Sequence, residues 1–171
     1  FRRVLFRSVD DLYVNAVVID DSTSEIAIVS ADIHSIPNAI YKDIVARIKK
    51  DASIDENNIL IAATHTHNSP CLDGGPLSDH VVWEDYVEQF KKNVVTAVCM
   101  AKKSKQLVRI GAGKGNNANH VFNRRLKKPD GSIAMNWLNP EFLADCIQDG
   151  VVDPEMTVLK LENAIGEPIA F

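Results

Sequence analysis

The sequence predicts an α/β fold in which two helices pack against a mixed β-sheet. First, β-branched apolar runs alternate along the chain with two stretches whose apolar residues recur at helical spacing. Second, 46% of the 171 residues are hydrophobic and 25% are charged, which is ordinary for a globular core. Third, no apolar run approaches the roughly 20 residues that a membrane-spanning helix needs.

The first eight residues, FRRVLFRS, are left out of this prediction. One reading frame of a common short-read sequencing adapter encodes this string, so we interpret residues 1–8 as an artefact. An ordinary basic N-terminal segment is the alternative. Without Arg2, Arg3 and Arg7, the 19 basic residues become 16 against 23 acidic ones, and the net charge moves from −4 to −7. Because the sequence also stops within an apolar run, we expect residues 9–171 to be part of a longer protein.

Three apolar runs predict strands in the first part of the chain. Residues 12–21 and 25–32 are rich in valine, isoleucine and alanine, and acidic and serine residues at 20–24 predict a hairpin turn between them. The run ILIAATHT at 59–66 predicts a third strand. A helix separates this strand from the hairpin, which favours a mixed sheet.

Two stretches predict helices, and each closes with a pair of lysines. The first begins near Ser35, a plausible N-cap, with Pro37 in the first turn. Its apolar residues at helical spacing are Ile40, Ile44 and Ile48. The second begins near Trp83, and its predicted buried stripe is Tyr86, Val87, Phe90, Val94, Ala97 and Val98.

The remainder of the chain predicts further strands and turns. Residues 107–113 suit another buried strand, and Pro129-Asp130-Gly131 is a strong turn signal. Residues 155–163 alternate as a strand does, and residues 166–171 predict its hairpin partner.

Composition also bears on partners and redox chemistry. The acidic balance argues against nucleic acid as a partner. Cys71, Cys99 and Cys146 are odd in number and widely spaced, so they offer neither a disulfide framework nor a CxxC metal pair. We expect Cys99 to lie in the core. No oligomeric state is predicted.

Two histidines one residue apart, His65 and His67, close the run at 59–66. Because a strand has a period of two, both imidazoles would point to the same side. Neutral imidazole binds Zn²⁺, and catalytic zinc takes about three protein ligands and an open position. A chance pair with an ordinary core histidine is the alternative. The Gly- and Pro-rich loop at 68–80 favours a metal or catalytic site, because active-site loops tend to follow strand ends.

Asp32 and His34 close the strand at 25–32 in the same way. If the two strands lie side by side, these residues fall close to His65 and His67. We therefore expect Asp32 and His34 to support the site from the neighbouring strand, with a turn or helix cap as the alternative for Asp32. His80 and His120 have no partner pattern and are expected on loops or the surface.

The segment HVFNRR suggests a different chemistry. Arg124 or Arg125 could donate two hydrogen bonds to a carboxylate or a developing oxyanion, although a basic surface pair is the simpler interpretation. The glycine-rich GAGKGN at 111–116 follows a strand, but it matches neither GxGxxG nor a complete Walker loop.

Four motifs occur in the order found in the neutral/alkaline non-lysosomal ceramidase family. They are VSADIH at 29–34, ATHTHNSP at 63–70, NRR at 123–125 with a following DG turn, and VDPEMTVLKLENAIGEPIA at 152–170. From about Leu12 to Phe171 the chain resembles the first part of that family's N-terminal catalytic domain. The family's usual THTHSGP differs at Asn68-Ser69, and this departure beside the site bears on the substrate more than on the metal.

The resemblance implies a zinc amidase that cleaves the N-acyl bond of ceramide to give a fatty acid and sphingosine. By position it implies that His65 binds Zn²⁺ and that His67 contacts substrate or assists proton transfer. It implies that Asn123 and Arg124 bind near the polar head of the substrate, and Arg124 would also stabilise the oxyanion. The family's other ligands, a histidine, a glutamate and a tyrosine, and its serine nucleophile are expected beyond Phe171. The chain alone should therefore be inactive and bind zinc weakly at most.

The resemblance further implies a lipid-like N-acyl amide substrate and association of the full-length protein with a membrane surface. It implies a secreted, periplasmic or cell-surface location. Two other classes stay open: another HxH metal-dependent amidohydrolase, and a non-catalytic binding domain with a decayed site. The early hairpin argues against an amidohydrolase barrel, because barrels are built from alternating βα units.

Overall fold

The computed structural model describes residues 10–73, 82–137, 141 and 143–170. Residues 1–8, interpreted above as an adapter artefact, and His80 lie outside the described residues. The chain forms two compact units, residues 1–105 and 106–171, and each is described by itself. Among the described residues, no helix combines the length and the apolar character that a membrane crossing requires.

The first unit contains a three-stranded mixed sheet in the order β1-β2-β3. Strand β1 (Val14–Asp20) pairs antiparallel with β2 (Glu25–Ala31), and β2 pairs in parallel with β3 (Ile59–Ala63). The predicted hairpin is thereby confirmed. Its turn is closed by the Asp21 carboxylate, which accepts hydrogen bonds from Thr23 and Ser24.

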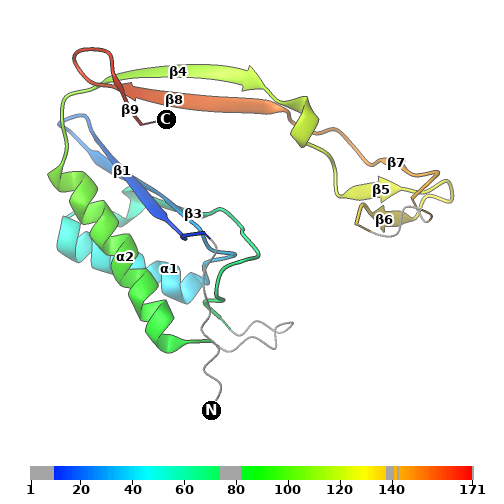
Figure 1. The fold of residues 1–171 in the computed structure, drawn as a ribbon, viewed down its shortest axis with the longest axis horizontal. Coiled ribbons are helices and arrows are strands. Elements are labelled where there is room, and N and C mark those ends of the chain that lie inside the picture. Colours follow the sequence, from blue (N-terminus) through cyan, green and yellow to red (C-terminus); the bar gives the residue numbers. More distant parts are fainter. Residues whose placement is uncertain (1–9, 74–81, 138–140, 142, 171) are drawn as a thin grey trace. The chain divides into compact units, whose positions relative to one another are not determined.

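Helices α1 (Asn38–Ala52) and α2 (Glu84–Lys103) lie on the same face of this sheet (Figure 1). Together with β2 they form a continuous core, in which the largest fully buried side chains are Ile33, Ile44, Ile48, Ile54, Val29, Val94 and Val98. Cys99 packs against this core, as expected.

The predicted boundaries of the helices hold except at the start of α1. That helix begins at Asn38 after Pro37, and no side chain caps it, so the proposal of Ser35 as N-cap was wrong. The physical reason is that Pro37 occupies the N-cap position, so Ser35 lies too far before the helix to cap it, and its hydroxyl lies 3.2 Å from the Nδ1 atom of His34. Helix α2 begins directly after Trp83, as predicted.

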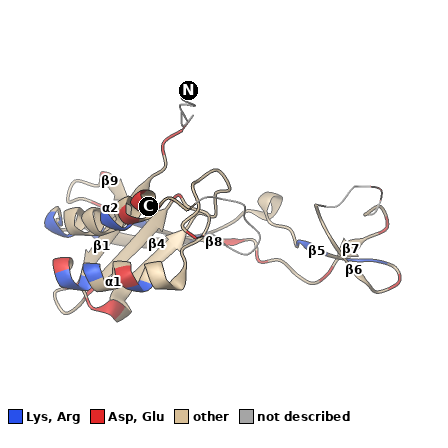
Figure 2. Ribbon diagram, turned by 90° about the horizontal axis from the view of Figure 1, so that it is seen from below, with Lys and Arg blue, Asp and Glu red and all other residues tan. Residues whose placement is uncertain are grey.

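Basic and acidic residues are interspersed along α1 and α2 (Figure 2). Arg47 on α1 binds Asp43 on the same helix at 3.0 Å and Glu88 on α2 at 2.6 Å. Lys102 near the end of α2 binds Glu25 of β2 and the carbonyl oxygen of Ala52. These contacts fasten the outer surfaces of the helices to each other and to the start of β2.

The second unit consists of two small antiparallel sheets, so the strands of the chain do not join one sheet. The first has the order β4-β8-β9, from β4 (Arg109–Asn116), β8 (Glu155–Glu162) and β9 (Pro168–Ala170). The second has the order β6-β5-β7, from β5 (Arg125–Lys127), β6 (Ile133–Met135) and β7 (Ile147–Gln148).

Most predictions for this unit are confirmed, including the β8–β9 hairpin. The turn at Pro129-Asp130-Gly131 also forms, with Gly131 at φ 84° donating to the Lys128 carbonyl. The expected burial of the strand at 107–113 was wrong, because all eight residues of β4 are exposed. Glycine occupies every second position from 111 to 115, so this stretch of one face has no side chains to pack.

Replacing Ile48 by alanine should destabilise the protein by about 2–5 kcal/mol, because it leaves a cavity under the sheet. Ile48 is fully buried, whereas Met100 on α2 is 66% exposed and provides the control Met100→Ala. Urea unfolding followed by far-UV circular dichroism measures both. An Ile48→Ala cost as small as that of Met100→Ala would contradict the assigned core.

Replacing Asp21 by asparagine should make the protein less stable at neutral pH but not in strong acid. The hydroxyl of Thr23, followed by the backbone N–H groups of Ser24 and Thr23, lowers the pKa of Asp21 from 3.8 to about 2. A lowered pKa adds stability that is fully present above pH 3.8 and is lost as the pH falls through about 2. Unfolding free energies measured across this range should therefore converge for the two proteins. A constant difference would contradict the assignment.

Candidate metal centre

The site is built where two parallel strands end side by side. The register pairs Ala31 of β2 with Ala63 of β3, so both strands reach the same edge of the sheet together. The contact continues past the strands, since the N–H of Thr64 donates to the Ala31 carbonyl at 3.0 Å and that of His65 to the Ile33 carbonyl at 3.1 Å. The segments that follow the two strands are therefore held next to each other.

The chain turns sharply at His65. Strand β3 ends at Ala63 rather than at Thr66, and His65 adopts φ 62°, in the left-handed region. This conformation costs a residue with a Cβ atom about 1–2 kcal/mol. Strand alternation was thus the wrong reason to expect His65 and His67 together, because the turn, and not the pleat, directs them. Such outliers cluster at functional sites.

Three imidazole rings meet at this edge. The ring centroids of His34 and His65 lie 4.3 Å apart, those of His34 and His67 4.7 Å, and those of His65 and His67 5.0 Å. His34 thus lies close to the other two rings, as expected for strand ends that lie side by side; its supporting role stays a prediction. We call this group the histidine cluster.

Hydrogen bonds fix the position of His34 and His65. The Nδ1 atom of His65 lies 2.7 Å from the carbonyl oxygen of His34. A carbonyl oxygen only accepts, so Nδ1 carries the proton and the lone pair of the neutral ring is on Nε2. The N–H of His34 donates in turn to the Ser69 hydroxyl at 3.1 Å. A metal-binding histidine commonly donates its other ring N–H to a carbonyl oxygen, as His65 does to His34.

The electrostatics favour neutral imidazole at His34. Desolvation by partial burial, followed by the neighbouring His65 and His67, lowers the pKa of His34, while Asp73 acts in the opposite direction. The neutral ring is the form that binds metal ions.

The histidine cluster fits a divalent metal ion by its donor chemistry. One nitrogen from each of the three rings lies within 4.8 Å of the other two. Since Zn–N bonds measure about 2.1 Å, the ligand atoms of one zinc ion are about 3.4 Å apart, which small side-chain rotations can reach. Three nitrogen donors also match the number that catalytic zinc takes from proteins. Among the described residues, this is the group that could share an ion.

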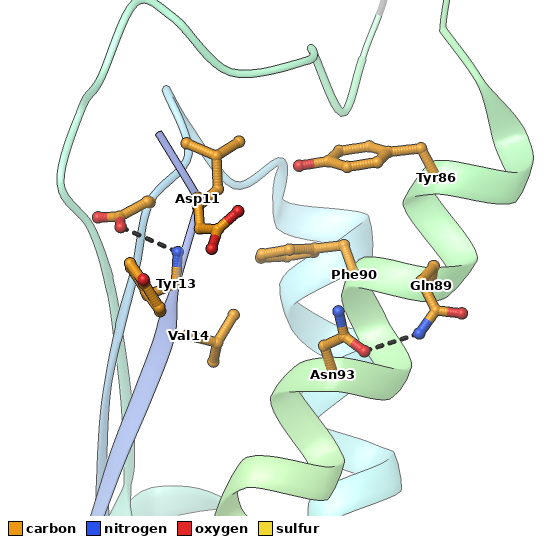
Figure 3. A pocket seen from close by; sticks show the side chains of 9 residues that line it. Asp11, Tyr13, Val14, Tyr86, Gln89, Phe90 and Asn93 are labelled. Atoms are coloured by element: carbon orange, nitrogen blue, oxygen red, sulfur yellow. Dashed lines mark hydrogen bonds between the residues drawn. The ribbon is translucent and has the colours of Figure 1, made fainter. Parts of the chain in front are cut away.

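Asp32 occupies a different place from the one expected. Its carboxylate accepts a hydrogen bond from the N–H of Tyr13 at 3.0 Å and is not part of the histidine cluster. It lines a cavity of about 240 Å³ between the start of β1 and α2, toward which Tyr86 and Phe90 of α2 point (Figure 3). The contact ties the start of β1 to the end of β2, which agrees with the alternative of Asp32 as a turn cap.

Asn123 and Arg124 lie in the second unit. The Asn123 amide donates to the Asp149 carbonyl at 2.5 Å and accepts from the N–H of Arg125 at 3.0 Å, so it holds the local loops together. The exposed Arg124 guanidinium lies over the Trp137 ring, 4.7 Å from its centroid. Arg125 instead binds Asp149. The substrate-binding and catalytic roles of Asn123 and Arg124 stay predictions. His120 is exposed in a 3₁₀ turn (Ala118–His120), as expected.

Sequence reasoning missed three features of these sites. It predicted that His34 supports the cluster from outside, whereas its ring lies within the cluster. The histidine at the end of VSADIH could have indicated this. It overlooked Ser69, whose contact with His34 spans 35 positions of the sequence. It also overlooked Trp137, which lies after the β5–β6 hairpin that begins next to Arg124 and is not part of any motif.

The structure is an α/β domain with three histidines at one edge of its first sheet that could hold a metal ion. A sequence model of the family "Neutral/alkaline non-lysosomal ceramidase, N-terminal" matches residues 9–171, and the chain therefore belongs to this family. It is 29% identical over 167 residues to the neutral ceramidase of Pseudomonas aeruginosa, an alignment that covers 91% of this chain and 23% of that protein.

Two solved structures resemble the chain. A ceramidase complexed with C2 matches with a TM-score of 0.62 at 24% identity, covering 87% of this chain and 23% of its own. A crystal structure of the neutral ceramidase from Pseudomonas aeruginosa matches with a TM-score of 0.55 at 24% identity, covering 88% and 24%. These likenesses confirm the α/β fold. The chain spans about a quarter of the length of these relatives.

Replacing His65 by glycine should give a more stable protein than replacing it by alanine, by about 0.5–1 kcal/mol, because only glycine adopts a positive φ without strain. Both variants lose the imidazole, so the difference between their free energies of unfolding reports the cost of the backbone conformation alone. At Leu60, an exposed residue of β3 without a positive φ, the order should reverse, since glycine weakens a strand. Urea unfolding of the four variants measures this. Equal stability of the two His65 variants would contradict the strained turn.

Proposed function

We propose that the protein to which this chain belongs is a zinc-dependent hydrolase of N-acyl amide bonds in a ceramide-like lipid. The observation that carries the proposal is the histidine cluster, whose donor set fits zinc, within a chain of the ceramidase family. His65 is the proposed principal ligand, through the Nε2 atom that its hydrogen bond to the His34 carbonyl leaves unprotonated. Ceramide, the lipid that the family name indicates, is the proposed substrate class.

The reaction adds water across the carbon–nitrogen bond of the amide, which releases a fatty acid and an amine. Bound zinc supplies a Lewis acid that polarises the amide carbonyl. His67 is exposed, and its ring lies 5.0 Å from that of His65, so its ring nitrogen can accept a proton from water and return it to the leaving amine. This is the role proposed for His67.

Arg124 is the proposed partner of the developing oxyanion. Its guanidinium is exposed, and it is spread over the Trp137 ring, a contact that limits the side-chain positions it samples. A cation positioned before the reaction stabilises negative charge without further rearrangement. Asn123 serves this arrangement by holding the adjacent loop, in keeping with its two backbone contacts.

A lipid substrate also suggests where the protein acts. A ceramide-like molecule resides in membranes, so we propose that the full-length protein meets its substrate at a membrane surface. The second candidate class, a binding domain with a decayed site, predicts no turnover in the full-length protein. The amidohydrolase barrel is not proposed further, since the chain belongs to the ceramidase family.

His65→Ala in the full-length protein should abolish zinc binding and fatty-acid release together, because it removes a direct ligand. Arg124→Ala should retain zinc and lower kcat by about 10²–10³-fold, the usual cost of losing one oxyanion donor. Zinc is measured by elemental analysis, and turnover by fatty-acid release from a ceramide analogue.

The matched controls are His120→Ala and Lys127→Ala, which remove an exposed imidazole and an exposed cation from the second unit. Both should leave zinc content and turnover unchanged. Full activity of His65→Ala would overturn the zinc assignment. Absence of turnover in the zinc-loaded wild type with ceramide analogues would favour the decayed binding domain.

A further inference from the structure

Two successive arginines in the second unit, Arg124 and Arg125, have partners of different kinds. Arg125 forms an ion pair with the Asp149 carboxylate at 3.2 Å, and its carbonyl accepts the N–H of the same residue at 3.2 Å. The guanidinium of Arg124 instead lies over the indole ring of Trp137, with its Cζ atom 4.7 Å from the ring centroid. One cation is therefore held by a carboxylate and the other by a neutral ring.

The kind of partner determines what each cation can still bind. A carboxylate accepts N–H groups of an arginine and offsets its charge, so Arg125 is engaged in holding its own loop. The face of an indole attracts a cation through its quadrupole, and tryptophan offers no hydrogen-bond acceptor. The contact with Trp137 therefore restricts the movement of Arg124 and leaves its charge for an anion.

The β5–β6 hairpin determines where Trp137 lies. The turn of the hairpin is held by the Asp130 carboxylate, which accepts from the N–H of Ser132 at 2.8 Å and from its hydroxyl at 2.7 Å. At the open end, one step beyond the last strand pair, the N–H of Asn136 donates to the Arg124 carbonyl at 2.9 Å. Backbone contacts thus place residue 137 beside Arg124, and the indole only has to turn toward it.

Apolar packing is the competing explanation for this tryptophan. Tryptophan is highly buried on average in proteins. The Trp137 side chain is 59% exposed, so more than half of its surface is in contact with water. A ring that mainly filled a core would not lie in this way, whereas a ring that serves the cation above it can.

We propose that Trp137 is a positioning residue for Arg124: its indole holds the guanidinium in the conformation that meets the developing oxyanion, without neutralising it. This inference rests on the role in the reaction that is proposed above for Arg124. Because the oxyanion develops only on the way to the transition state, loss of the indole should lower kcat and leave KM nearly unchanged.

The test compares Trp137→Leu and Trp137→Phe in the full-length protein, with kcat and KM measured on the ceramide analogue. Trp137→Leu should lower kcat about two- to fivefold, the equivalent of a cation–π contact at an exposed site. Trp137→Phe should lie between that variant and the wild type, because a phenyl ring is a weaker partner for a cation. The matched control is Phe122→Leu, which removes another exposed aromatic ring of the second unit and should leave both constants unchanged.

The pair Arg124→Ala and Arg124→Ala/Trp137→Leu shows whether Trp137 acts through Arg124. If it does, the double variant should have the same kcat as Arg124→Ala alone. A further fall of equal size, or a wild-type kcat in Trp137→Leu, would overturn the positioning role and leave that of Arg124 intact. If Arg124→Ala itself retains full kcat, both roles fail. Circular dichroism and zinc content of each variant, together with the partial recovery in Trp137→Phe, separate loss of positioning from misfolding.

Discussion

The parallel pairing of β2 with β3 is the constraint on which the candidate site depends. In an antiparallel pair, the end of one strand meets the start of the other, so residues 34 and 65 would lie at opposite edges. The parallel register instead brings Ala31 and Ala63 opposite each other. Backbone hydrogen bonds from Thr64 and His65 then carry the pairing past both strand ends. The histidine cluster is a direct consequence of this register.

The core beneath the sheet makes that register unique. Ala27, Val29 and Ala31 alternate on the buried face of β2, and α1 and α2 cover them. A slip of one residue would turn this set outward and bring Ser30 into the core, which is unfavourable because a hydroxyl would lose its water. Helix packing on one face therefore positions side chains at the edge of the sheet, where the loops can bear strain because the strands below them are packed into the core.

The sequence allowed prediction of those parts of the fold that local periodicity determines. The hairpin around Asp21, the start of α2 after Trp83 and the β8–β9 hairpin follow from apolar patterns and turn residues. The left-handed turn at His65 could not be predicted, because threonine and histidine continue a strand pattern and nothing local marks a positive φ. The contact of Ser69 with His34 is equally hidden, since it joins residues brought together only by the parallel crossover. The prediction that β4 is buried was wrong. The run at 107–113 begins with apolar residues, but glycines at alternate positions follow and have no side chains to pack.

Ser69 links the departure from the family motif to the chemistry of the cluster. In the usual THTHSGP form this position is a glycine, which has no side chain to accept a hydrogen bond. Here the Ser69 hydroxyl accepts from the N–H of His34 and holds that residue against the loop after β3. The same loop therefore contributes His65 and His67 as imidazoles and Ser69 as the anchor for the third ring. A change that looked, in the sequence, like a matter of substrate preference acts in the structure on the geometry of the three histidines.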